Sequence, residues 1–419
     1  MFVRPKSTPV LRRTIAALAG ASLVAGLAAC GGGSSGAAQP DGSLMLYTWV
    51  SSQSDRAQWE EFVAAGQKTL PDLKVQIDGP SFEDYWTKVK TRLSGGDPPC
   101  LLTTQAARAQ ELNGVLAPLD DLMAANGVSK TDFDQSMIDG MTVDGSVRAI
   151  PYDAEPLVVF YNVDRFKQAG LPLPGTTFTR DQFIADAKAL TSGDHYGLGI
   201  SPGLFSALGY TTAGGSTWLK DGALDLTNPA FVSDMQWYFD LVNVQGVAKS
   251  PEASTKSDEL QQAFINGDVA MLSEGPWNYG TFAESAKFEL GMAVVPSPSG
   301  QPHAMTAGSG FGIASNCADK EGAFRAIMAM TTTDALSSVA ASRGIVPSRS
   351  ESLPAWSQGK TPQSSAVIEA SLGNATAQRT TETWNQVETA FTQYMSEGFR
   401  GQRTAADILG TIQSSVSGG

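Results

Sequence analysis

Short apolar runs and amphipathic helical segments alternate along this chain from Leu44 onward, and this alternation restricts the fold more than any other feature. Residues 44–49 have the pattern of a strand, and in the segment after it Trp59, Phe62 and Val63 recur at helical spacing. Strands that alternate with helices are typical of folds in which helices cover a sheet. The sequence therefore predicts an α/β fold.

Apolar spacing and capping residues place further elements. Strands are expected at 73–77, 100–103, 147–151, 157–161 and 288–296. Helices are expected to begin at side chains able to accept a hydrogen bond from a first helical turn, namely Ser54, Ser81, Thr179 and Asn228. A further helix is expected from about Asp319 to Met330. Two amphipathic helices are expected near the C-terminus, from Trp384 and from Ala405. Trp59, Trp86 and Trp237 lie on apolar helical faces and are predicted to be core residues.

The length of the chain, 419 residues, predicts more than one core. A single hydrophobic core seldom serves more than about 250–300 residues. Three loops offer places for the chain to cross between two lobes, at 152–156, 296–300 and 344–347. We therefore expect the chain to divide as follows: lobe I from 44–152 and 300–345, lobe II from 153–299 and 346–419.

The first thirty residues predict export and a lipid anchor. Basic residues precede an apolar run, 14–28, which has the length of a signal-peptide core rather than of a bilayer span. The run ends in Leu27-Ala28-Ala29-Cys30, which resembles a bacterial lipobox and implies cleavage before Cys30 and its lipidation. Residues 1–29 are expected to be a signal peptide and 30–43 a flexible tether, with the protein held at the outer face of the cytoplasmic membrane. Arg12-Arg13 leaves both general secretion and twin-arginine export open.

Charge and metal-binding residue types exclude several functions. The formal charge is −13, and loss of the four basic residues before Cys30 makes it −17, which argues against a nucleic-acid partner. His195 and His303 lie far apart, with no second ligand at helical spacing, so no metal is expected. Cys100 and Cys317 have no C-x-x-C spacing and leave open whether they form a single bridge.

Four stretches of the chain carry a family resemblance. They are 150–153 (IPYD); 160–166 (FYNVDRF) with 169–171 (AGL); 263–271 (AFINGDVAM) with 275–277 (GPW); and 344–347 (GIVP). In this order they resemble the family 1 extracellular solute-binding proteins, the maltose-binding-type subunits of ATP-driven sugar importers. The resemblance spans roughly Leu44 to Ile412, and it departs from the family at Cys100, where an aspartate is frequent.

This resemblance implies a two-lobed, periplasmic-binding-protein-like fold of type II, in which each lobe is a sheet flanked by helices and a ligand cleft lies between the lobes. It further implies three crossover segments as a hinge, closure on a ligand, and transfer of a carbohydrate to the membrane permease of an ATP-binding-cassette importer. No cofactor is expected, and the protein is expected to be a monomer.

A sugar presents hydroxyl edges and apolar C–H faces, so its site needs carboxylates or amides beside aromatic rings. Trp277 follows a predicted strand end, and the resemblance places it in the cleft as a stacking ring. Glu155, in the first crossing loop, matches a carboxylate that contacts sugar hydroxyls in maltose-binding relatives, and Asp153 is its neighbouring candidate.

Further ligand contacts are expected on both lobes. Trp49 ends the first strand, at the edge of the sheet where ligands collect in α/β folds. Trp384 aligns with a sugar-contacting aromatic of the family, although it also opens an apolar helical stripe. The remaining candidates are Gln105, Trp218 and Arg343, with the backbone amides around Ser309.

Other functions fit the sequence less well. A glycoside hydrolase needs two carboxylates about 5–10 Å apart across the sugar, and the adjacent acids Asp120-Asp121 lie in a surface-like context. No nucleophile motif accompanies them, so no enzymatic activity is expected. A same-fold binding protein for glycerol phosphate or a peptide is the alternative, although only Arg343 and Arg379 lie close to the suspected loops. A purely structural lipoprotein is the remaining hypothesis.

Overall fold

The computed structural model describes residues 43–95 and 98–417. All of them belong to one compact unit, Gly36–Gly419. Cys30, the expected signal peptide and nearly all of the expected tether lie outside the described residues.

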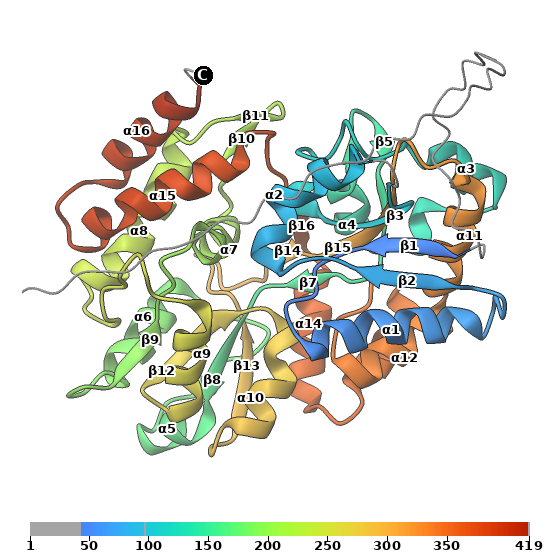
Figure 1. The fold of residues 1–419 in the computed structure, drawn as a ribbon. Helices are drawn as coiled ribbons and strands as arrows, with labels where there is room; N and C mark the ends of the chain where they lie inside the picture. Colours follow the sequence, from blue (N-terminus) through green and yellow to red (C-terminus); the bar gives the residue numbers. More distant parts are fainter. Residues whose placement is uncertain (1–42, 96–97, 418–419) are drawn as a thin grey trace, which may run out of the picture. The chain divides into compact units, whose positions relative to one another are not determined.

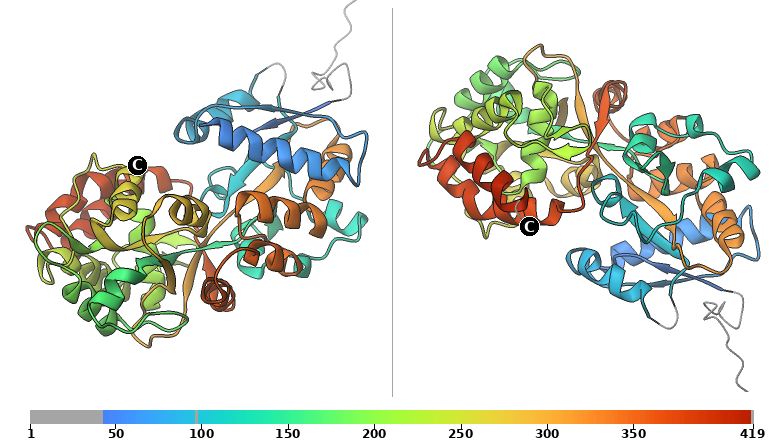
Figure 2. Two further views of the ribbon diagram at one scale, coloured as in Figure 1. Left: turned by 90° about the horizontal axis from the view of Figure 1, so that it is seen from below. Right: turned by 90° about the horizontal axis from the view of Figure 1, so that it is seen from above.

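Two large hydrophobic clusters divide the described residues into two lobes. The cluster of lobe I includes Trp59, Phe62 and Phe311, and the cluster of lobe II includes Phe160 and Phe239. Both views of Figure 2 show the two groups of elements side by side, joined by segments that run between them. The described chain is therefore an α/β protein with two lobes.

Lobe I contains a five-stranded sheet in the order β2-β1-β3-β15-β6. Strands β1 and β2 pair in parallel, as do β1 and β3, whereas β15 runs antiparallel to both β3 and β6. Helices α1 and α12 lie together on one side of this sheet (Figure 1). The strands are β1 (Leu44–Tyr47), β2 (Val75–Asp78), β3 (Leu101–Gln105), β6 (Ala149–Pro151) and β15 (Ser309–Ile313). The helices are α1 (Gln53–Gln67), α2 (Phe82–Leu93), α3 (Asp120–Ala125), α4 (Gln135–Gly140), α11 (Lys320–Met330) and α12 (Thr333–Arg343).

Lobe II contains a four-stranded sheet in the order β13-β8-β12-β9. Helices α7, α8, α15 and α16 pack on one another above this sheet in Figure 1. The strands are β8 (Val158–Asn162), β9 (Tyr196–Gly199), β12 (Val269–Glu274) and β13 (Leu290–Val294). The helices are α5 (Val163–Gln168), α6 (Arg180–Ala189), α7 (Leu204–Gly214), α8 (Pro229–Asn243), α9 (Ser257–Asn266), α10 (Tyr279–Ser285), α14 (Pro362–Leu372), α15 (Trp384–Phe399) and α16 (Ala405–Ser417).

Short hairpins and 3₁₀ turns connect the larger elements. Each of two small hairpins turns at an Asp-Gly pair with positive φ angles. The hairpins are β4 (Thr142–Val143) with β5 (Ser146–Val147), and β10 (Leu219–Lys220) with β11 (Ala223–Leu224). The 3₁₀ turns are η1 (Ala106–Arg108), η2 (Lys130–Asp132), η3 (Pro276–Asn278) and η4 (Ser350–Ser352), the last followed by helix α13 (Leu353–Ser357).

Side-chain caps explain where several helices begin. The hydroxyl of Ser81 accepts from the backbone N–H of Asp84, and Thr179 caps α6 in the same way, as the sequence predicted. The prediction for α1 was wrong by two residues, because Ser52, rather than Ser54, is extended and accepts from the N–H of the third helical residue. The predicted cap Asn228 is confirmed, and α11 begins close to the predicted position, with Asp319 as its cap.

Three crossings join the lobes, and two of them contribute strands to a small sheet in the order β16-β14-β7. The first crossing passes through β7 (Glu155–Pro156), the second leads from β14 (Ala304–Ala307) into β15, and the third follows α12. The second lies later than the predicted segment 296–300, because Ser297 and Gly300 are both hydrogen bonded to Phe178 of lobe II. Strand β16 (Ala375–Ala377) pairs with β14 and leads towards α15.

A disulfide joins Cys100 to Cys317 within lobe I. Cys100 directly precedes β3, and Cys317 lies just before α11, so the bond links two segments that are 217 residues apart in the sequence. The structure therefore answers the question that the cysteine spacing left open.

Candidate ligand-binding cleft

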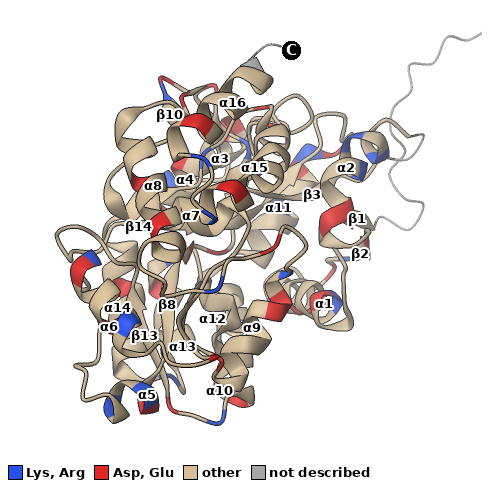
Figure 3. Ribbon diagram, turned by 90° about the vertical axis from the view of Figure 1, so that its left-hand side faces the viewer, with Lys and Arg blue, Asp and Glu red and all other residues tan. Residues whose placement is uncertain are grey.

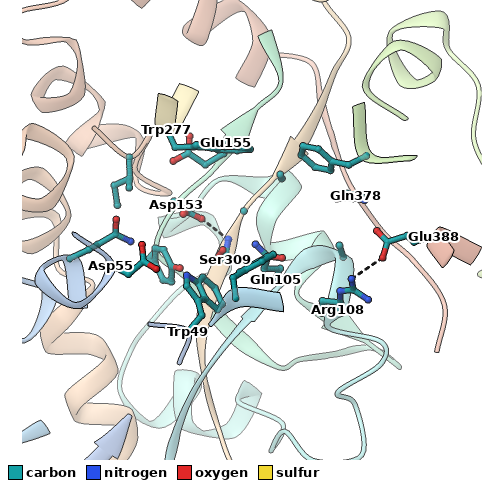
Figure 4. A pocket seen from close by; sticks show the side chains of 18 residues that line it. Trp49, Asp55, Gln105, Arg108, Asp153, Glu155, Trp277, Ser309, Gln378 and Glu388 are labelled. Carbon is teal, nitrogen blue, oxygen red and sulfur yellow. Dashed lines mark hydrogen bonds and ion pairs between the residues drawn. The ribbon is translucent and has the colours of Figure 1, made fainter. Parts of the chain in front are cut away.

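A cavity of about 530 Å³ lies between the lobes, a volume typical of small-molecule sites. Lobe I contributes Trp49, Asp55, Gln58, Phe82, Gln105, Ala107, Arg108 and Tyr152 to its lining. The crossings contribute Asp153, Glu155, Ala307, Gly308, Ser309 and Ile345, and lobe II with its adjoining segment contributes Phe205, Trp277, Gln378 and Glu388. In Figure 4, Trp277 and Glu155 lie towards one end of this cavity and Arg108 and Glu388 at the other.

The structure brings together five of the eight residues predicted to contact a ligand: Trp49, Gln105, Asp153, Glu155 and Trp277. The other three do not belong to the cavity lining. Trp384 is fully buried in the lobe II core beside Trp218, whose indole N–H donates to the carbonyl of Arg379 at 2.8 Å. Arg343 forms an ion pair with Glu61 that joins α12 to α1. Ligand contacts of these three residues stay a prediction.

Glu155 and Asp153 lie on the first crossing, and we call the part of the cavity lining that they form the floor. One carboxylate oxygen of Glu155 is left unpaired. Its side chain is 3% exposed, and its Oε1 accepts from the backbone N–H of Val346 at 3.0 Å. Its Oε2 is buried and has no hydrogen-bond partner among the described residues. Burial, and then the charge of Asp153, raise the pKa of this carboxyl well above its usual range. A ligand hydroxyl or ammonium group that donated to Oε2 would satisfy this atom and favour the ionised form.

Asp153 is the second carboxylate of the floor. It is 7% exposed and accepts from the backbone N–H of Ser309. Burial raises the pKa of Asp153 to about 8. The amide of Ser309, which the sequence offered as a ligand donor, is therefore used to hold this carboxylate in place.

The two carboxylates connect all three crossings. Both belong to the first crossing, and Glu155 pairs with Ala307 of the second in the β7–β14 ladder. Asp153 forms a backbone bridge with Pro347 of the third crossing, next to the Val346 amide that Glu155 holds. A ligand bound to this floor therefore contacts the segments whose rotation would open or close the cleft.

Trp277 gives lobe II an exposed ring in the cavity. It is 36% exposed and lies in the turn η3, directly after β12. The ring lies over the Cα of Gly275, so closely that a Cβ at that glycine would be 2.1 Å from two of its carbon atoms. Glu274 accepts from the N–H of Gly275 at 3.0 Å and from Gln261 at 3.2 Å, which fixes the turn. Gly275 and the fixed turn therefore support one face of the Trp277 ring.

Phe82 gives lobe I a matching ring that the sequence did not reveal. It is the first residue of α2 and is 39% exposed. Its ring meets Trp49 edge-on at 5.3 Å, and Trp49 in turn packs against Trp59 at 5.4 Å. Two of the four large apolar side chains that are exposed in the described residues therefore line this cavity, one from each lobe.

The charged lining is predominantly acidic. Arg108 is the one basic residue of the lining, and its guanidinium is paired with Glu388 at 2.8 Å and with Glu111 at 3.4 Å. Asp55, Asp153, Glu155 and Glu388 supply the acidic groups. Sequence patterns did not indicate Arg108 and Glu388, which are 280 residues apart and carry no local signal of their pairing.

The sequence also matches a protein family. The model of the family described as bacterial extracellular solute-binding protein covers residues 50–336, which is more than half of the chain. The chain belongs to this family. The predicted resemblance is confirmed, and the two lobes and the cleft are those of a solute-binding protein.

Related proteins extend over most of this solute-binding protein. The maltodextrin-binding protein MdxE of Bacillus subtilis is 27% identical over 313 residues, which are 71% of this chain and 71% of the relative. A substrate-binding protein, Lmo0181 of Listeria monocytogenes, was solved with cycloalternan; its TM-score is 0.78 at 21% identity, over 90% of this chain and 98% of that one. UgpB of Mycobacterium tuberculosis, solved with glycerophosphocholine, has a TM-score of 0.74 at 21% identity, over the same shares. These two structures establish similarity of fold.

The described part of the solute-binding protein contains neither a membrane-spanning helix nor a metal-binding cluster. Across residues 43–95 and 98–417, no helix has the length and apolar character that crossing a membrane requires. Within the same residues, no three His, Cys, Asp or Glu side chains are grouped in a way that would hold a metal ion.

The raised pKa of Asp153 predicts how the stability of the unliganded solute-binding protein depends on pH. The folded state binds this proton more tightly than the unfolded state does, so ionisation favours unfolding. The resulting loss of stability begins above the unfolded pKa of about 3.9 and is complete only when the pH passes the folded value of about 8. We expect Asp153→Asn to reduce the fall in stability between about pH 5 and pH 8, as measured by unfolding midpoints.

The matched control is Asp194→Asn, in an exposed turn outside the cavity. It is expected to leave the pH dependence of wild type unchanged. Equal slopes for wild type and Asp153→Asn would contradict the prediction.

Proposed function

We propose that this protein is the substrate-binding subunit of an ATP-binding-cassette importer and that it binds a mono-, di- or oligosaccharide in the cleft between its lobes. The observation that carries the proposal is the pair of exposed rings, Phe82 and Trp277, which line one cavity from opposite lobes above two buried carboxylates. Among the proteins compared above, one is named for maltodextrin and one was solved with cycloalternan.

The chemistry of the lining suits a saccharide. The flat rings offer apolar surface to the C–H faces of a sugar. Glu155 offers a buried, unpaired oxygen to its hydroxyl groups. A hydroxyl that donates to this oxygen favours the ionised carboxylate, whose hydrogen bonds are roughly twice as strong as neutral ones. A ligand that touches both rings and the floor bridges the lobes and raises the population of the closed state.

The same lining argues against a phosphorylated solute. Phosphate sites use arginine forks or several lysines. Arg108 is the one basic group in the lining, and two carboxylates already pair with it. The glycerophosphocholine complex of UgpB keeps such a solute among the outcomes of the test, but the acidic cleft of this chain does not favour it.

Transport would proceed by binding and handover, without a catalytic step in this chain. In the closed state each lobe would present one surface to the membrane permease, and ATP hydrolysis would take place on another subunit. Acidic and basic residues are interspersed along the ribbon in Figure 3. We expect the protein to be a monomer when it contacts the permease.

The lipid anchor is part of the proposal. Cys30 follows Leu27-Ala28-Ala29 and precedes a glycine-rich segment, an arrangement that resembles a lipobox. Two or more acyl chains on one residue would give stable attachment to the membrane. We expect Cys30→Ala to move the protein from the membrane pellet to the soluble fraction, whereas Ser34→Ala should leave it in the pellet. A Cys30 variant that stays in the pellet would refute the anchor.

A thermal-shift screen tests the ligand class. The chain from Gly31 onward is screened against mono-, di- and oligosaccharides, with glycerophosphocholine and short peptides as the competing classes. A ligand at 100 times its Kd stabilises the folded state by about 2.7 kcal/mol, which moves the midpoint visibly. Stabilisation by saccharides supports the proposal. Stabilisation by glycerophosphocholine or peptides alone would replace the proposed ligand class with another.

A further inference from the structure

A second cavity lies beside the main one. It has a volume of about 270 Å³ and a more polar lining. Sequence neighbours line the two cavities from opposite sides: Ala106 and Thr380 line the second cavity, whereas Ala107 and Gln378 line the first. The turn η1 and the segment after β16 therefore form a partition between the two cavities.

Direct contacts hold this partition together. The hydroxyl of Thr380 donates to the carbonyl of Ala107 at 2.6 Å. Beside it, the guanidinium of Arg108 contacts the carboxylate of Glu388 on α15 at 2.8 Å, as the dashed line in Figure 4 marks. The first bond joins η1 of lobe I to the segment that leads into α15, and the second joins η1 to α15 itself. The partition therefore spans the cleft.

Two additional contacts restrict the side chain of Arg108. Its guanidinium also contacts Glu111 at 3.4 Å and lies over the ring of Trp86 at 5.4 Å. The side chain of Arg108 is 13% exposed, and that of Glu388 is 29% exposed. A partly buried ion pair with these additional contacts is a firmer barrier than a freely exposed pair, which contributes little.

We propose that the Arg108–Glu388 pair and the Thr380–Ala107 hydrogen bond end the binding cleft and so select the length of the saccharide. This inference rests on the proposed function. A short saccharide fills the main cavity between the two exposed rings and the partition. The partition keeps additional sugar units out of the second cavity, where Gln110 and Arg379 would otherwise offer polar groups to them.

The test compares affinities along two series, maltose to maltohexaose and chitobiose to chitohexaose, by titration calorimetry. In wild type, we expect affinity to level off after the short members. In Arg108→Ala/Glu388→Ala, we expect the affinity for the hexasaccharide to rise at least about tenfold relative to the disaccharide, because the longer chain reaches the second cavity. Thr380→Val should shift this ratio in the same direction by a smaller factor, and it tests the partition independently if the double variant folds poorly.

The ratio separates length selection from a change in lobe closure. An altered closure equilibrium changes every affinity by the same factor and leaves the ratio unchanged. Glu289→Ala is the matched control, because it removes an exposed ion pair with Lys167 on lobe II and should keep the wild-type ratio.

Three outcomes would overturn the inference. Wild-type affinity that keeps rising to the hexasaccharide, or an unchanged ratio in both partition variants, refutes length selection while the proposed function stands. If neither series nor any saccharide of the screen binds to wild type, the proposed function fails and the length selection fails with it.

Discussion

Replacing Trp277 with alanine is expected to weaken saccharide binding by about 30-fold or more. The ring is 36% exposed in the unliganded protein, so its removal also takes buried surface from the turn, and we expect a modest fall in the free energy of unfolding. In the complex the ring would be covered by the sugar, and loss of a central aromatic contact costs about 2 kcal/mol or more, which is roughly 30-fold in Kd. Calorimetry and thermal unfolding measure the two effects separately.

Leu173→Ala is the control for the tryptophan. Leu173 is 43% exposed and does not line the cavity, so its truncation should alter neither affinity nor stability much. Unchanged affinity in Trp277→Ala would remove the stacking ring from the proposed site.

Gly275→Ala tests the placement of the ring without removing it. The φ angle of Gly275 is −81°, which any residue adopts, so the new methyl group adds no backbone strain. It would lie 2.1 Å from the ring of Trp277, and the ring must move. We expect a loss of affinity smaller than that of Trp277→Ala, while Gly280→Ala, whose Cβ would meet no atom within 4 Å, should bind as wild type does.

Removing the disulfide with Cys100→Ser/Cys317→Ser is expected to lower the free energy of unfolding by about 2–5 kcal/mol. The bond closes a loop across 217 residues of sequence separation, so it restricts the unfolded chain strongly. Chemical denaturation of wild type and variant measures the difference. Reduction of wild type should reproduce it, and the same reductant should leave the variant unaffected.

The affinity for a saccharide provides a second readout for the disulfide. Neither cysteine lines the cavity, so the folded variant should bind its ligand as wild type does. A reduced wild type that unfolds at the same denaturant concentration as the oxidised protein would contradict the stabilising role.

Local patterns in the sequence predicted most of the elements but not every boundary. Ser81 and Thr179 cap their helices as expected, because each is followed at once by a helical apolar pattern. Before α1 two serines compete. Ser52 is the cap, and the carboxylate of Asp55 accepts a hydrogen bond from the backbone N–H of Ser51 at 2.8 Å. This choice depends on the path of the chain after β1, which spacing alone does not specify.

Tertiary placement decided which predicted aromatic residues reach the cavity. Trp384 fits both an apolar helical stripe and a family sugar contact, and the structure buries it in the core of lobe II. Phe82 continues the stripe of Trp86 and Val89, so spacing predicts a core residue. It remains exposed because α2 begins at the cavity, beyond the buried part of lobe I.

Charged partners were harder to predict than rings. Glu155 was found because it lies within a crossing loop that matches the family, and its contact with Val346 follows from the third crossing. Arg108 and Glu388 belong to different lobes and are joined only when the chain has folded. Sequence patterns report such pairs poorly, since neither residue has a neighbour that reveals the other.

The bond between Cys100 and Cys317 also determines what happens when a protease cuts the chain. Strands β8, β9, β12 and β13 all lie between these two cysteines in the sequence. A single cut in any loop among these strands, such as the turn at Asp221, leaves both fragments covalently joined through lobe I. Outside the cell, a nicked molecule would therefore keep its N-terminal segment and its lobe II helices in one covalent assembly until the bond is reduced.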